Sequence, residues 1–342
     1  METPPPPLDP TRALRHYPRM LQPRSRIEPL GNAGGFSGAS FWRFKSELGT
    51  LGLKAWPAPR SLECRRSSIR KIHAYLFDAS ASDAVLGPIL PVPFFNSDRV
   101  TFVEESARFW ELVPWLPGAP DQSQPRDLAR TRIAFAALAR LHRALGRDAM
   151  STLTSGMNAR MESLDSLDAF GFNELEACIR ADQCEQAARA WILLARRTLK
   201  ALDDRLVEQI NVLLPVQPCL GDARPDHFLF DGPKLTGLID FAAMKFDTVA
   251  ADLGRLLPDW AGNDRLVRDA ALNAYVAVRP LSNEELGAIP VFEQAAAFFA
   301  GESWIRWHYI EGRRFDDPVA PRLGLERSVA RMIDLFGGRL IT

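Results

Sequence analysis

The chain has 342 residues, of which 46% are hydrophobic and 25% charged, so it can form a large folded core and is not disordered as a whole. Its 42 basic and 42 acidic side chains balance, so the chain lacks the overall excess of basic charge that is typical of nucleic-acid binders. At roughly 150 residues per domain, a chain of this length is expected to form about two domains.

The N-terminal segment, residues 1–29, is rich in Pro and Arg and lacks apolar periodicity. Such a segment buries too little apolar surface to offset the entropy of ordering, so we expect a mobile or surface-draped extension. From residue 27 the pattern changes. Residues 27–44 and 49–57 are short aromatic and aliphatic runs punctuated by Gly, which is typical of strands joined as antiparallel hairpins.

One helix and further strands follow these hairpins. Residues 61–79 place Ile69, Ile72 and Leu76 at helical spacing, which predicts a helix with one buried stripe. Residues 99–118 return to strand-like runs and end in a segment rich in Pro and Gly. The sequence therefore predicts a small β-rich lobe that contains one helix.

The remainder of the chain is mainly helical. Residues 128–145 and 184–214 carry apolar side chains at helical spacing. The helices are interrupted at residues 227–241, where two apolar runs flank the turn sequence DGPK and predict a hairpin set on the helical lobe. We divide the chain into three parts: an extension over 1–29, a β-rich N-lobe over 30–115 and a helical C-lobe over 116–342.

Cysteine usage and apolar run lengths argue against a secreted or membrane protein. The four cysteines form no CxxC pair and have no His at zinc-finger spacing, so we expect reduced thiols. The longest apolar runs are far shorter than the roughly 20 residues that span a bilayer, and the first residues lack the apolar core of a secretory signal. We expect a cytoplasmic protein with no membrane or nucleic-acid partner.

Three polar side chains surround the predicted hairpin at intervals that suggest phosphoryl transfer. Asp222 precedes the first strand, His227 lies five positions after Asp222, and Asp240 ends the second strand. A phosphotransferase must hold the nucleotide phosphates, bridge them with metal ions and orient the acceptor hydroxyl with a carboxylate. In the kinase arrangement, a catalytic-loop Asp, a metal ligand and a further metal-binding Asp occur at these intervals.

The segment LGDARPDHFLFDGPKLTGLIDFAAMKFDTVAADLGRLL resembles the aminoglycoside phosphotransferase and choline kinase-like superfamily of small-molecule kinases. That family has His-Gly-Asp, then Asn, then an Ile-Asp-Phe type motif and an Asp-Leu pair. This chain matches it at 221–222, 239–241 and 252–253. The resemblance is strong over 219–257 and looser over the rest of 30–342. It implies an α+β, two-lobed protein kinase-like fold, with a small β-rich N-lobe and a larger helical C-lobe that carries the catalytic hairpin.

The resemblance also implies roles for the polar residues. It implies Asp222 as the general base or hydroxyl-orienting carboxylate, and Asp240 as the main ligand of Mg²⁺ or Mn²⁺. Leu220 stands where the family has His, and His227 where it has Asn. Because imidazole suits manganese better than magnesium, three alternatives stay open for His227. It binds the metal directly, it contacts a water or phosphate, or the second metal site is lost and Asp226 substitutes.

The N-lobe carries candidate nucleotide-binding residues. The stretch GNAGGFSGASFWRF is a Gly-rich turn where the backbone can approach phosphates, and its candidates are Gly34, Gly35, Ser37 and Gly38. The resemblance implies that Lys54 binds the nucleotide phosphates and that Glu63 pairs with it from the following helix. It also places the adenine at FWELVPWLPG. There the Val113 carbonyl and the Trp115 amide are the candidate contacts, because Pro114 has no N–H.

The function that these features imply is transfer of the γ-phosphoryl group of ATP, or alternatively GTP, to a hydroxyl of a small molecule. Aminoglycosides, choline-like alcohols, amino alcohols and sugars all fit the resemblance, and fold alone does not choose among them. The departures at Leu220 and His227 add the alternative of a nucleotide-binding pseudokinase that acts as a sensor or interaction module. A helical binding protein without nucleotide is a third class, against which the kinase-like order of the motifs argues.

Overall fold

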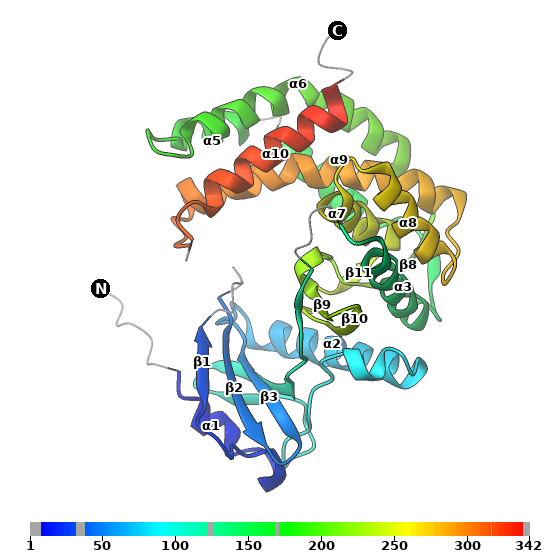
Figure 1. Cartoon of the computed structure of the whole chain (residues 1–342). Coiled ribbons are helices and arrows are strands. Elements are labelled where there is room, and N and C mark those ends of the chain that lie inside the picture. Colours follow the sequence, from blue (N-terminus) through cyan, green and yellow to red (C-terminus); the bar gives the residue numbers. More distant parts are fainter. Residues whose placement is uncertain (1–7, 32–37, 122–125, 168–170, 316, 338–342) are drawn as a thin grey trace. The chain divides into compact units, whose positions relative to one another are not determined.

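The computed structural model describes residues 8–31, 38–121, 126–167, 171–315 and 317–337. The chain divides into two compact units, which we call the N-terminal unit and the C-terminal unit (Figure 1). The N-terminal unit is Met1–Gln124 with Asp226–Ala242, and the C-terminal unit is Pro125–Pro225 with Ala243–Thr342. The hairpin that the sequence places with the helical lobe is thus part of the β-rich unit.

The N-terminal unit is built on an antiparallel sheet. Its elements in chain order are α1(Pro10–Leu14), η1(Arg19–Leu21), β1(Glu28–Gly31), β2(Ser40–Ser46), β3(Gly49–Ala55), α2(Leu62–Ser82), η2(Gly87–Ile89), β4(Val103–Glu105), β5(Arg108–Pro114), β6(Ala119–Pro120), β9(Phe228–Asp231) and β10(Lys234–Leu238). Five strands form one sheet in the order β1-β2-β3-β5-β4, and a second sheet has the order β10-β9-β6. The 3-10 turn η4(Pro225–His227) leads into β9.

The register of β3 decides which side chains share a face of the sheet. Lys54 lies opposite Phe41 of β2 and Glu111 of β5. Directly opposed residues of antiparallel strands point to the same face, whereas successive residues alternate. Lys54 and Glu111 therefore share the face that meets α2, and their neighbours Leu53 and Leu112 lie on the other face.

The second face of the sheet is covered by the N-terminal segment. Leu14, Tyr17 and Leu21 are buried in one cluster with Trp110 and other sheet residues. The side-chain amide of Gln22 donates to the carbonyls of Leu14 and Tyr17, which closes the segment on itself. Of the two alternatives for the extension over residues 1–29, mobile or surface-draped, residues 8–21 therefore fit the second, because a few apolar side chains at helical spacing are hidden in a Pro- and Arg-rich composition. Residues 1–7 lie outside the described residues.

The C-terminal unit is mainly helical. Its elements are α3(Leu128–Leu145), β7(Met150–Thr152), α4(Ser155–Ser166), α5(Phe172–Cys178), α6(Glu185–Ile210), β8(Leu214–Cys219), β11(Lys245–Asp247), α7(Val249–Ala261), α8(Arg265–Val276), α9(Asn283–Ile305), the π-helical η5(Arg306–Ile310) and α10(Ala320–Phe336). A small sheet has the order β11-β8-β7. The predicted α+β class, with a small antiparallel lobe and a larger helical part, is confirmed.

Close helix packing forms the core of this unit. Gly301 of α9 lets α6 approach, because a Cβ at this position would meet the Trp191 ring at 2.2 Å. The Trp191 indole N–H donates to the carbonyl of Phe298, so the buried ring is also satisfied as a donor. Within the described residues, no helix is both long enough and apolar enough to cross a bilayer.

Candidate active site

Lys54 is held by a carboxylate of the neighbouring strand. Its ammonium lies 3.4 Å from Oε1 of Glu111 and 3.9 Å from the centroid of the Trp56 ring. Burial opposes the ionisation of Glu111, but Lys54, His73 and Trp56 outweigh it and lower its pKa to about 2. The Lys54 side chain is therefore fixed next to a permanent negative charge at neutral pH.

The ion pair expected between Lys54 and Glu63 is wrong. The Glu63 side chain is 77% exposed and pairs with Arg66 in the first turn of α2. A first-turn Glu is favoured by the helix dipole, so the position of Glu63 is explained without a role in binding. The helix instead supplies His73, whose Nε2 lies 2.8 Å from Oε2 of Glu111.

The other candidates for nucleotide contact lie in and beside the sheet. Gly34, Gly35 and Ser37 fall outside the described residues, and Gly38 is exposed with φ +76°. Val113 pairs with Gly52 of β3. The Trp115 amide donates to the carbonyl of Thr50 at 3.0 Å, so this N–H, which was expected to meet the adenine, is already used within the unit.

The β9–β10 hairpin brings His227 and Asp240 together. The His227 carbonyl accepts the Ile239 amide at 2.9 Å, which aligns the start of β9 with the end of β10. Nε2 of His227 then lies 3.7 Å from Oδ2 of Asp240. Asp240 has φ +61°, a left-handed conformation that Asp tolerates better than most non-Gly residues. A strained backbone residue with a half-exposed carboxylate is typical of a functional site.

The surroundings of His227 indicate its tautomer. Its side chain is only 8% exposed, and its Nδ1 is buried without a hydrogen-bond partner among the described residues. A proton on Nδ1 would be a buried donor without an acceptor, which costs about 1–3 kcal/mol. The neutral ring is thus expected to carry its proton on Nε2, where it faces Asp240. A metal-bound Nε2 would require the opposite tautomer, whose N–H normally has an acceptor.

The loop before Asp222 is anchored by a buried carboxylate of α7. The amides of Leu220 and Gly221 donate to Oδ2 and Oδ1 of Asp252, at 2.7 and 2.8 Å. Gly221 has φ +76°, and a Cβ there would meet the carbonyl of Ala243 at 2.3 Å, so only Gly fits. Leu220, which stands in place of the family's His, is fully buried. The backbone before Asp222 is therefore fixed by its hydrogen bonds to Asp252 and by its close contact with the backbone of Ala243.

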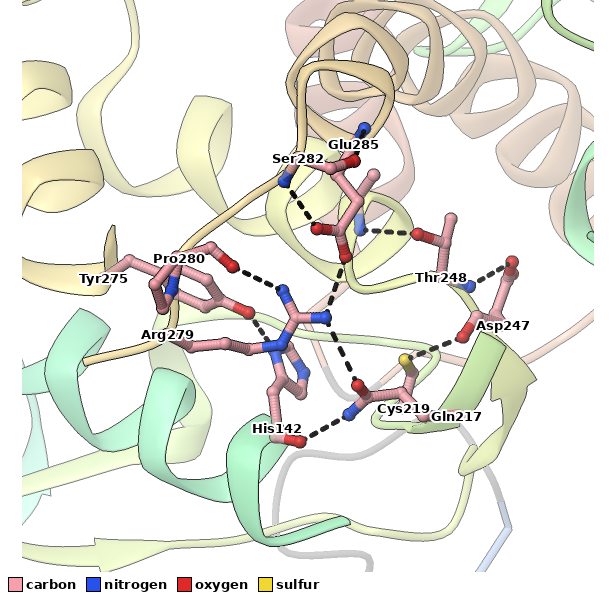
Figure 2. Close-up of polar contacts among 11 residues, drawn as sticks. His142, Gln217, Cys219, Asp247, Thr248, Tyr275, Arg279, Pro280, Ser282 and Glu285 are labelled. Carbon is pink, nitrogen blue, oxygen red and sulfur yellow. Dashed lines mark hydrogen bonds and ion pairs between the residues drawn. The ribbon is translucent and has the colours of Figure 1, made fainter. Parts of the chain in front are cut away.

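A buried polar network supports this anchor (Figure 2). Arg279 pairs with Glu285 at 2.8 Å and contacts Gln217, whose amide donates to the carbonyl of His142 at 2.6 Å. Nδ1 of His142 lies 2.8 Å from the Tyr275 hydroxyl. Burial raises the pKa of Tyr275 well above its ordinary value, so the hydroxyl keeps its proton. It can donate to Nδ1, which leaves the His142 proton on Nε2.

The Nε2 proton of His142 completes the link to the loop. Nε2 lies 3.1 Å from Oδ2 of Asp252, so the carboxylate accepts one side-chain and two backbone donors. The network therefore connects α3, α7 and the start of α9 to the backbone next to Asp222. His142 is fully buried, and its contact with Asp252 orients that carboxylate.

Arg255 contacts the side chain of Asp222. Its Nε lies 3.4 Å from Oδ1 of Asp222, and its Nη1 donates to Asp259 at 3.0 Å. Arg331 donates to the other oxygen of Asp259 at 2.7 Å, so the two guanidinium groups share one carboxylate. In the described part of the chain, no hydrogen bond engages Oδ2 of Asp222. Asp222 is 44% exposed, and its free oxygen can accept a hydroxyl proton.

Several of these residues were not among the site candidates that the sequence predicted. Glu111, His73 and Arg255 have no motif of their own. A usable signal for Glu111 was available, because a lone Glu in the apolar run FWELV of a buried strand requires a cationic or hydrogen-bonding partner. His73 gave no such signal, since its partner depends on where the helix lies on the sheet.

Comparison with known proteins adds to this geometry. A model of the phosphotransferase enzyme family matches residues 32–284. A homoserine kinase of Afipia carboxidovorans is 30% identical over 223 residues, which are 63% of this chain. The chain spans 62% of the length of that relative.

Solved structures resemble the whole chain at low identity. An aminoglycoside phosphotransferase from Alicyclobacillus acidocaldarius has a TM-score of 0.62 and 16% identity, with 98% of each chain covered. An amicoumacin kinase in complex with AMP-PNP and Ca²⁺ also has a TM-score of 0.62, at 14% identity, with 95% of this chain and 91% of that chain covered. These likenesses confirm the predicted kinase-like fold.

Proposed function

This chain belongs to the phosphotransferase enzyme family, and from that premise we propose that it transfers the γ-phosphoryl group of ATP to a hydroxyl of a small molecule. The observation that carries the proposal is the Asp222 loop. Asp252 ties down the two backbone amides before Asp222, and Arg255 holds one of its carboxylate oxygens. A carboxylate held in this way is suited to orient an acceptor hydroxyl and to receive its proton.

The N-terminal unit supplies a positive charge for the phosphates of the nucleotide. Lys54 is a desolvated cation whose orientation is set by Glu111 and the Trp56 ring, and in the proposed reaction it contacts the phosphates. Because the side chain is already ordered, little rotamer entropy is lost when a phosphate binds. Phosphoryl transfer depends mainly on such positioning and on charge stabilisation.

Asp240 fits the role of metal ligand. Its carboxylate is a hard oxygen donor, it is half exposed, and its backbone conformation fixes the direction of the side chain. A divalent metal, when bound, would neutralise charge on the transferring phosphoryl group. The tautomer of His227 favours the second of its three alternatives, in which Nε2–H donates to a bound water or a phosphate.

The acceptor that we propose first is a hydroxy amino acid or amino alcohol of the size of homoserine, because a homoserine kinase is among the relatives. The free cysteines support a reducing, cytoplasmic setting. The departure at Leu220 gives the pseudokinase alternative little support, since the side chain is buried and the loop is anchored through its backbone.

The test is acceptor-dependent release of ADP from ATP or GTP by the purified chain, with Mg²⁺ or Mn²⁺. L-Homoserine, ethanolamine, choline, 1-amino-2-propanol and kanamycin form the acceptor panel, and L-2-aminobutyrate, which lacks the hydroxyl of homoserine, is the matched control. We expect at least one hydroxyl compound to raise ADP release and L-2-aminobutyrate to leave it unchanged. A nucleotide-dependent rise in Tm without turnover on any acceptor would favour the pseudokinase, because ligand binding alone stabilises a folded protein.

For His227, replacement by Asn is expected to leave the ratio of Mg²⁺- to Mn²⁺-supported activity within about twofold, because the imidazole is proposed to donate a hydrogen bond and not to bind metal. His227→Ala, which removes the donor, is expected to lower kcat by about 10-fold. Steady-state rates at several metal concentrations measure both quantities. A shift of tenfold or more toward Mg²⁺ in His227→Asn would instead show that the imidazole coordinates the metal.

A further inference from the structure

The carboxylate of Glu111 is shared by three donors from three places in the N-terminal unit. Oε1 faces the Lys54 ammonium at 3.4 Å, and Oε2 accepts the indole N–H of Trp56 at 2.8 Å. His73 of α2 lies 2.8 Å from the same Oε2, and its Nδ1 lies 2.7 Å from the hydroxyl of Thr101. We call these five residues the Glu111 cluster.

The direction of each hydrogen bond follows from the state of Glu111. A carboxylate with a pKa of about 2 is ionised at neutral pH and can only accept. Nε2 of His73 must therefore carry a proton and donate it to Oε2. In the neutral ring Nδ1 is then an acceptor, which the Thr101 hydroxyl satisfies. Every polar atom of the His73 ring has a partner, although the residue is only 3% exposed.

Building on the proposed phosphotransferase function, we infer that His73 is a positioning residue, which orients Lys54 for the nucleotide phosphates by holding Glu111 from helix α2. His73 does not contact Lys54 itself. It fixes Oε2, and the rigid carboxylate then directs Oε1 at the ammonium. The helix thus positions Lys54 through a strand Glu and a His, where the sequence predicted a direct pair with a helix Glu.

The geometry makes Lys54 sensitive to the donors on Oε2. At 3.4 Å, the contact between Lys54 and Oε1 is long for a charge-assisted hydrogen bond, so it fixes the carboxylate weakly by itself. Lys54 and Glu111 are also largely buried, and a buried pair is favourable only where further hydrogen bonds complete it. Without His73, Oε2 would keep Trp56 alone, and the carboxylate could turn about its last bond.

The test compares two amides that mimic different ring nitrogens. The amide of His73→Gln can reach Glu111 as Nε2 does, whereas that of His73→Asn is shorter and reaches toward Thr101 as Nδ1 does. For the Asn variant, kcat/KM for ATP is expected to fall about 10- to 100-fold, the range that corresponds to one charge-assisted hydrogen bond. The Gln variant is expected to stay within about threefold of wild type, and KM for the acceptor is expected to stay unchanged in both. The inference would be overturned if both variants lost the same factor in kcat/KM for ATP. It would also be overturned if the KM for the acceptor rose by as large a factor as kcat/KM for ATP fell.

A second experiment asks whether His73 acts through Lys54. His73→Asn is combined with Lys54→Met, and kcat/KM for ATP is compared in a double-mutant cycle. If His73 works by orienting the ammonium, its replacement has no further effect once the ammonium is gone. Additive losses would show that His73 acts independently and would contradict the inference. Wild-type turnover is the reference throughout, so its absence would count against the proposed function and not against the role of His73.

Discussion

Replacement of Asp222 by Asn is expected to lower kcat by about 10²- to 10⁴-fold, which corresponds to a barrier higher by roughly 3–5 kcal/mol. The amide oxygen can still accept the hydrogen bond from Arg255, so the loop keeps its shape. What is lost is the negative charge that orients the acceptor hydroxyl and receives its proton. KM for ATP is therefore expected to change little. Steady-state kinetics and Tm, measured on the same preparation, separate this loss from unfolding.

The matched control for that variant is Asp231→Asn at the exposed end of β9. It makes the same chemical change and is expected to alter kcat by less than about twofold, as is usual for a surface substitution away from a site. If Asp222→Asn turned over as fast as wild type, the carboxylate would have no part in the chemistry. The assignment of Asp222 would then have to be abandoned.

Replacement of Asp240 by Asn is expected to lower kcat by about 10³-fold, because a bound metal contributes several kcal/mol of charge stabilisation to the transition state. Asn is the replacement of choice because, like Asp, it tolerates the left-handed backbone at φ +61°. The free energy of unfolding is thus expected to stay near that of wild type, whereas Asp240→Ala adds roughly 1–2 kcal/mol of backbone strain.

The dependence of rate on metal concentration distinguishes this role from a structural one. In Asp240→Asn, half-maximal activity is expected to require at least about tenfold more metal, since a charged oxygen ligand is replaced by a neutral one. Thermal unfolding of the Asn and Ala variants measures the backbone contribution separately. An unchanged metal requirement in Asp240→Asn would contradict a role of this carboxylate in binding metal.

The spacing of residues within one short segment is enough to propose most of the candidate site. It does not reveal which residues of distant strands lie opposite one another. Asp222, His227 and Asp240 could be proposed as site residues because they flank one hairpin, whose strands and turn are encoded by neighbouring residues. The partner of Lys54 could not be identified in this way. Glu63 is the first carboxylate after Lys54 along the chain, but Glu111 lies opposite Lys54 through the pairing of β3 with β5, strands far apart in the sequence.

The buried network of the C-terminal unit shows the same limit. Asp252 was noticed only as part of a motif, and its hydrogen bonds to the Asp222 loop and to His142 join residues from three distant segments. Likewise, Leu14, Tyr17 and Leu21 gave too weak a signal to outweigh the Pro- and Arg-rich composition around them. Overall composition predicts whether a segment can fold alone, but not whether it can cover a surface that another segment provides.

That covering segment has a practical consequence for anyone who expresses pieces of this protein. The family match starts at residue 32, so a domain cut at the conventional boundary would lack the helix and the 3-10 turn that seal the back of the β-sheet. Leu53, Leu112 and Trp110 would then be exposed to water as one apolar patch, and such patches promote self-association. A shortened clone is thus expected to precipitate or to require detergent, even though every residue proposed for chemistry is retained.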